Sequence, residues 1–111
     1  MNNDINEESF LAIKNSLEIH SEEEDTLTEE DMIIQIERRV ATMMERDMDL
    51  LMSYLYRLDI LEHKINNCLS PESPFHPYTC LATLIWNRQK ERVLSKQQYK
   101  QDKTVEEGWE W

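Results

Sequence analysis

The stretch that decides the fold is YLYRLDILEHKI, residues 54–65, in which a long helical pattern meets an Arg-Leu-Asp sequence at 57–59. This sequence is either a functional site or the junction between two helices. Asp59 is a favourable N-cap, and Glu62 stands three residues later, which is the spacing of a reciprocal capping pair. Arg57 would lie in the last turn of the preceding helix, where a cation offsets the helix dipole. We therefore interpret Arg57, Asp59 and Glu62 as a helix junction.

Before this junction, apolar residues recur at a mean spacing close to ~3.6, which is typical of an amphipathic helix. The sequence Thr-Glu-Glu-Asp at 28–31 resembles a capping box and places three acids in the first turn. The pattern predicts one helix over about 29–58 and a short helix over about 60–69. A kink near Asp47 is compatible with the pattern, although nothing in the sequence forces one. The apolar positions of the long helix are Ile33, Ile36, Val40, Met44, Met48, Leu51, Leu55 and Leu58.

The rest of the chain also favours helices. Three prolines punctuate residues 70–77 and predict a loop, after which Pro77 suits the first position of a helix over about 77–98. With one glycine in the chain, a β-sheet would lack its turns. The sequence therefore predicts an all-α protein, a small helical bundle over 28–99.

Both ends are expected to be flexible and acidic. The N-terminal arm, residues 1–27, contains a short helical pattern over 4–18, formed by Phe10 and later apolar residues. The C-terminal tail, residues 100–111, carries three glutamates and two tryptophans and is typical of a disordered end.

Charge is distributed unevenly along the 111 residues, whose formal net charge is −11. Acids dominate the first 31 residues, and bases dominate residues 88–103. This acidity argues against passive binding to nucleic acid or to an anionic membrane. No apolar run approaches the length of a membrane span, and no secretory signal is evident. Two cysteines in such a chain are expected to be free thiols, so we predict a cytoplasmic protein.

The stretches DLLMSYLYRLDILEHKI and LATLIWNRQKERVLSKQQY resemble a group of small bacterial helical proteins without an assigned activity. The resemblance covers roughly residues 33–99 and implies a helical fold, but it implies no function. The acidic arm and the tryptophan tail depart from the pattern of that group. The matching positions are Leu55, Tyr56, Arg57, Leu58, Asp59, Ile60, Glu62, Lys64, Leu84, Ile85, Arg88 and Gln89.

Candidate catalytic and metal-binding residues are few. His63, Cys68, His76 and Cys80 include ligand types that zinc prefers, but their spacing fits no structural zinc pattern. Cys80 with His76 would still need an orienting group and an oxyanion site to act as a nucleophile. We therefore expect no enzyme activity, no cofactor, no metal and no small-molecule ligand, and keep a thiol or zinc-dependent protein as the second alternative.

Two segments indicate binding instead. Trp109 and Trp111, together with Phe10, offer large apolar contacts to a partner. The basic helix 88–103 offers phosphate contacts, which makes a nucleic-acid-associated regulator the first alternative. The hypothesis we favour is a non-enzymatic protein–protein interaction module, an adaptor or accessory subunit, that binds a basic protein or a second copy in a homodimer. The residues for phosphate contact would be Arg88, Arg92, Lys96, Lys100 and Lys103.

Overall fold

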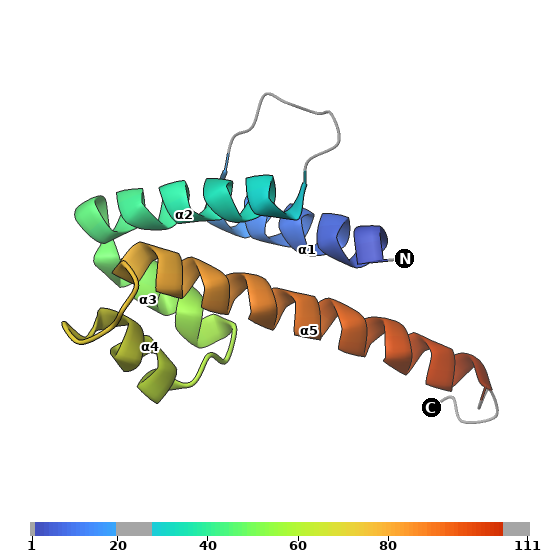
Figure 1. The fold of residues 1–111 in the computed structure, drawn as a ribbon. Coiled ribbons are helices and arrows are strands. Elements are labelled where there is room, and N and C mark those ends of the chain that lie inside the picture. Colours follow the sequence, from blue (N-terminus) through green and yellow to red (C-terminus); the bar gives the residue numbers. More distant parts are fainter. Residues whose placement is uncertain (1, 20–27, 106–111) are drawn as a thin grey trace.

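The computed structural model describes the backbone of residues 2–19 and 28–105 and the side chains of 5–19 and 28–98. All regular structure in these residues is helical, which confirms the expected small all-α bundle (Figure 1). The molecule measures 52 × 35 × 23 Å along its principal axes. The helices are α1 (Asn2–Leu17), α2 (Glu29–Arg46), α3 (Met48–Arg57), α4 (Glu62–Leu69) and α5 (Pro77–Val105).

The long helix α5 is the element on which the others assemble, because α1, α2 and α4 all pack against it. Figure 1 shows α5 running along the molecule, with α1 and α2 on one side and α4 near its beginning. The most deeply buried apolar side chains come from all five helices and form a single core. These side chains are Ile13, Ile36, Val40, Leu51, Leu55, Ile65, Leu81, Ile85 and Trp86.

The helix predicted over 29–58 is not continuous: Asp47, where the pattern left a kink open, divides it into α2 and α3. The Asp47 N–H donates to the Met43 carbonyl at 2.7 Å and ends α2. The Asp47 carboxylate accepts from the Leu50 N–H at 3.1 Å and caps α3. A short acidic side chain can compete in this way with helical backbone hydrogen bonds. The break allows the buried faces of both helices to reach the same core.

The predicted role of Asp59 as an N-cap is wrong, because Asp59 terminates α3 instead. Its φ is 63°, in the left-handed region that aspartate tolerates better than most residues. The Asp59 N–H donates to the Tyr56 carbonyl at 2.9 Å, and the Ile60 N–H donates to the Leu55 carbonyl at 3.2 Å. These two bonds form a Schellman motif, with Ile60 buried against the core. The N-cap of α4 is Leu61, whose side chain makes no capping hydrogen bond.

The described part of the N-terminal segment is a helix of the core and not a flexible arm. Phe10 and Ile13 are 6% and 0% exposed, and α1 packs against both α2 and α5. Arg39 of α2 donates from Nε to the Leu17 carbonyl at 2.6 Å, which satisfies an otherwise open helix end. The contacts of α1 therefore enlarge the core beyond the 28–99 region expected to fold.

The C-terminal helix also extends further than predicted. α5 continues to Val105, although the pattern predicted a helix ending near 98 and a flexible tail from 100. The predicted contact residues Trp109 and Trp111 lie outside the described residues.

The two cysteines form a disulfide, so the expectation of free thiols is wrong. Cys68 at the end of α4 and Cys80 in the first turn of α5 have Cα atoms 5.4 Å apart. The proline-rich loop between them reverses the chain and brings the two positions together. The spacing of the two cysteines in the sequence did not indicate that their Cα atoms lie so close together.

Within the described residues, no helix combines the length and the apolar character needed to cross a membrane.

Candidate binding groove between three helices

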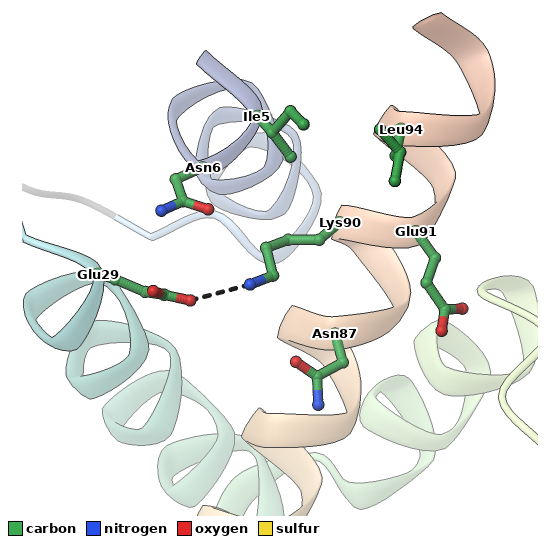
Figure 2. A pocket seen from close by; sticks show the side chains of 7 residues that line it. All are labelled: Ile5, Asn6, Glu29, Asn87, Lys90, Glu91 and Leu94. Atoms are coloured by element: carbon green, nitrogen blue, oxygen red, sulfur yellow. Dashed lines mark hydrogen bonds and ion pairs between the residues drawn. The ribbon is translucent and has the colours of Figure 1, made fainter. Parts of the chain in front are cut away.

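A groove lies where the N-terminal half of α1, the first turn of α2 and the middle of α5 meet (Figure 2). Its volume is about 490 Å³. Three helices far apart in the sequence supply the walls, so the groove exists only in the folded protein. Its lining residues are Ile5, Asn6, Glu29, Asn87, Lys90, Glu91 and Leu94.

Glu29 organises one wall of the groove. Its carboxylate accepts a hydrogen bond from Trp86 Nε1 at 2.7 Å and an ion-paired bond from Lys90 Nζ at 3.0 Å. The Lys90 nitrogen also lies 5.5 Å from the centroid of the Trp86 ring, within the range of a cation–π contact. Because Trp86 is 1% exposed, its N–H needs an acceptor, and Glu29 provides one. This triad fixes the start of α2 on α5.

The pKa of Glu29 is lowered, first by the Trp86 hydrogen bond and then by the hydrogen bond and charge of Lys90. A lowered pKa in the folded state stabilises the protein above the ordinary Glu pKa, and this contribution disappears as pH falls through the lowered value. The Glu29 side chain is 43% exposed, so solvent screens the ion pair and the effect is small.

We expect Glu29→Gln to lower the melting temperature slightly at neutral pH, because Gln still accepts from Trp86 but loses the charge. The difference from the unmodified protein should close as pH falls below the ordinary Glu pKa and through the lowered pKa of Glu29. Thermal unfolding of both proteins across this range checks the prediction. A difference that stays constant or widens toward low pH would contradict the assigned ionisation.

The rest of the lining is suited to binding a polypeptide. Ile5 and Leu94 are apolar, and Leu94 is 43% exposed. Asn6 and Asn87 carry amides that both donate and accept hydrogen bonds. Figure 2 shows these side chains arranged around the opening, with Lys90 directed toward Glu29. The aliphatic side chains can make apolar contacts with a bound segment, and the amides can form hydrogen bonds with it.

The predicted phosphate-binding stretch is partly used inside the protein. Arg88 donates from Nε to the Leu58 carbonyl at 2.8 Å, and Arg92 donates to the Arg57 carbonyl at 3.4 Å. Both arginines thus satisfy the carbonyls at the end of α3. Arg88 also pairs with Glu91 at 3.3 Å. Of the other bases in this set, Lys96 is exposed, and the side chains of Lys100 and Lys103 lie outside the described residues.

The remaining predicted residues do not assemble into a site. Arg57 occupies the last turn of α3 and Glu62 the first turn of α4, as expected, while Asp59 ends α3. Phe10, predicted to contact a partner, is buried in the core. Among the described residues, no group of three or more His, Cys, Asp or Glu side chains is placed to hold a metal ion. Cys80 is bonded to Cys68 and is therefore not a free nucleophile.

Sequence reasoning missed the Glu29–Trp86–Lys90 triad. Trp86 directly follows the apolar pair Leu84 and Ile85, and this local pattern is a signal from which its burial could have been predicted. Nothing in the sequence around Trp86 indicated its hydrogen bond to Glu29, because the two residues are 57 positions apart.

Comparison of the chain with protein-family models, curated proteins and solved structures finds no match. The resemblance to small bacterial helical proteins therefore stays a prediction.

Proposed function

We propose that the protein is a non-enzymatic protein–protein interaction module whose groove between α1, α2 and α5 binds a segment of a basic partner protein. The observation that carries this proposal is the lining of the groove, which combines the exposed Leu94 and the half-buried Ile5 with two amides and two carboxylates. Peptide segments offer the matching groups, namely aliphatic side chains, backbone N–H and C=O groups, and cations.

The charge of the chain favours a basic partner. The formal net charge is −11, and three acids, Glu29, Glu30 and Asp31, occupy the first turn of α2 beside the groove. Lys90, the lysine in the lining, is paired with Glu29. Complementary charge increases the association rate and suppresses binding to like-charged partners. The same argument makes a different, basic protein a better partner than a second acidic copy.

The cellular compartment is also part of this proposal. A cytoplasmic site was expected from two free thiols, but Cys68 and Cys80 are bonded. Disulfides persist mainly in oxidising compartments. The disulfide therefore favours an oxidising surrounding over the reducing cytoplasm.

Leu94→Asp should weaken partner capture by about tenfold or more, because it places a carboxylate on the apolar wall of an acidic groove. Leu61→Asp is the matched control, since Leu61 is 55% exposed and does not line the groove. The measurement is quantitative mass spectrometry of proteins recovered from native lysate by each variant, after nuclease treatment. The unmodified protein and the Leu61 variant should recover the same basic protein, and the Leu94 variant should lose it.

Equal recovery by both variants would contradict the groove as the binding surface. A partner lost on nuclease treatment would support the nucleic-acid alternative instead. Light scattering of the purified protein tests self-association. A dimer that Leu94→Asp dissociates would replace the basic partner with a second copy of this chain.

A further inference from the structure

We propose that the Cys68–Cys80 disulfide is a redox-controlled staple, and that its reduction releases α4 and the 70–76 loop while α1, α2, α3 and α5 stay folded. This inference does not depend on the proposed function, because neither α4 nor the loop lines the groove.

Apart from the disulfide, α4 has few attachments. It is 8 residues long, far below the length at which an isolated helix is stable in water. Its N-cap, Leu61, makes no side-chain capping bond. Among the described residues, no side-chain hydrogen bond or ion pair joins α4 to another helix. Within the part of the chain that the structure describes, what holds α4 on the bundle besides the covalent link is the burial of Ile65 and Cys68 and the partial burial of Leu69.

The other helices have connections that reduction leaves intact. Arg88 and Arg92 of α5 bind the carbonyls at the end of α3. Glu29 joins α2 to Trp86, and Arg39 joins α2 to the end of α1. Reduction should therefore affect one region of the protein and not the whole bundle.

Solvent can reach one of the two sulfur-bearing residues. Cys68 is 1% exposed, whereas Cys80 is partly exposed in the first turn of α5. In the loop that precedes Cys80 in the chain, residues between Leu69 and Thr79 enclose an open hollow of about 540 Å³. Phe75 in this loop is 63% exposed, so the rest of the protein covers little of the loop. Because Cys80 is the partly exposed cysteine of the pair, we expect a reductant to attack it and not the buried Cys68.

The reaction is exchange with a dithiol reductant. One thiolate of the reductant attacks Cys80 Sγ, the Cys68–Cys80 bond breaks, and Cys68 leaves with the electron pair and takes a proton. The second thiol of the reductant then displaces Cys80 from the mixed disulfide. The products are two protein thiols and the oxidised, disulfide form of the reductant, so two electrons and two protons have passed to the protein.

The expected size of the effect follows from the ring that the bond closes, since the two cysteines are 12 residues apart. Closure of a ring of this size corresponds to a change of about 100-fold in an opening equilibrium. Because α4 has few other contacts, we expect most of this change to appear as local opening of α4.

Hydrogen exchange of the full chain, oxidised and then reduced with a dithiol, tests the proposal. In the oxidised protein, mass spectrometry should first show the two-hydrogen deficit of one disulfide. On reduction, the hydrogen-bonded amides of residues 64–70 should exchange about 100-fold faster. Amides of α2, of α3 and of α5 beyond its first two turns should keep their rates. Cys68→Ser/Cys80→Ser should show fast exchange in α4 with or without the dithiol.

Three results would overturn the proposal. The first is unchanged exchange in α4, which would mean that packing alone holds it. The second is faster amide exchange in all helices, which would mean that the disulfide stabilises the whole fold. The third is two free thiols after mild oxidation, which would mean that no staple forms.

Discussion

Phe10→Ala should destabilise the protein by about 3–5 kcal/mol, the usual cost of truncating a buried phenylalanine. The Phe10 side chain is 6% exposed and belongs to the same core cluster as residues of α2, α3 and α5. Its removal leaves a cavity in the core, on the side where α1 packs against α2 and α5. Small domains have about 5–15 kcal/mol of stability in total, so the variant should lose a large fraction of it.

The adjacent residue is a matched control for this variant. Leu11 is 56% exposed on the same helix, so Leu11→Ala should change stability by no more than about 0.5 kcal/mol. Urea unfolding followed by circular dichroism measures both variants. The N-terminal segment would be a loosely attached arm, contrary to the structure, if Phe10→Ala and Leu11→Ala had equally small effects.

Trp86→Ala should have a similarly large effect, again about 3–5 kcal/mol. Trp86 is 1% exposed in the first half of α5, and its N–H is the donor that fixes Glu29 at the start of α2. Trp86→Phe keeps most of the apolar contact and loses the donor. Its cost should be lower, about 1–2 kcal/mol, because the partly exposed Glu29 carboxylate can turn to water and to Lys90.

An aromatic residue on the surface is the control for the tryptophan variants. Phe75 is 63% exposed in the loop before α5, and Phe75→Ala should leave the denaturation midpoint nearly unchanged. The order of stability should be Phe75→Ala above Trp86→Phe above Trp86→Ala. A Trp86→Ala protein as stable as the Phe75 variant would show that α5 is not packed as described.

The sequence predicted the helical class because its periodicity is a local property that repeats over many residues. The capping box at Thr28 was equally local, and the Thr28 hydroxyl does accept from the Asp31 N–H at 3.1 Å. Helix ends were harder to predict, because the same side chain serves several roles. Asp47 and Asp59 are both acceptable N-caps, yet only Asp47 caps a helix, while Asp59 adopts a left-handed conformation and ends one.

The groove and the disulfide could not be predicted for a different reason. Glu29 and Lys90 are 61 residues apart, and their meeting depends on how α2 packs on α5. Cys68 and Cys80 are separated by a loop whose path no pattern specifies. Arg88 and Arg92 were interpreted as a surface for phosphates because composition reports their charge but not the α3 carbonyls that they bind.

Site-specific photo-crosslinking in cells tests most directly whether the groove binds a partner. A photoreactive residue in place of Asn87, which is exposed in the groove, is compared with the same residue in place of Leu61. The proposal predicts that the Asn87 probe crosslinks to one basic protein and that the Leu61 probe does not. The absence of a crosslink from Asn87, or the same products from both positions, would contradict it.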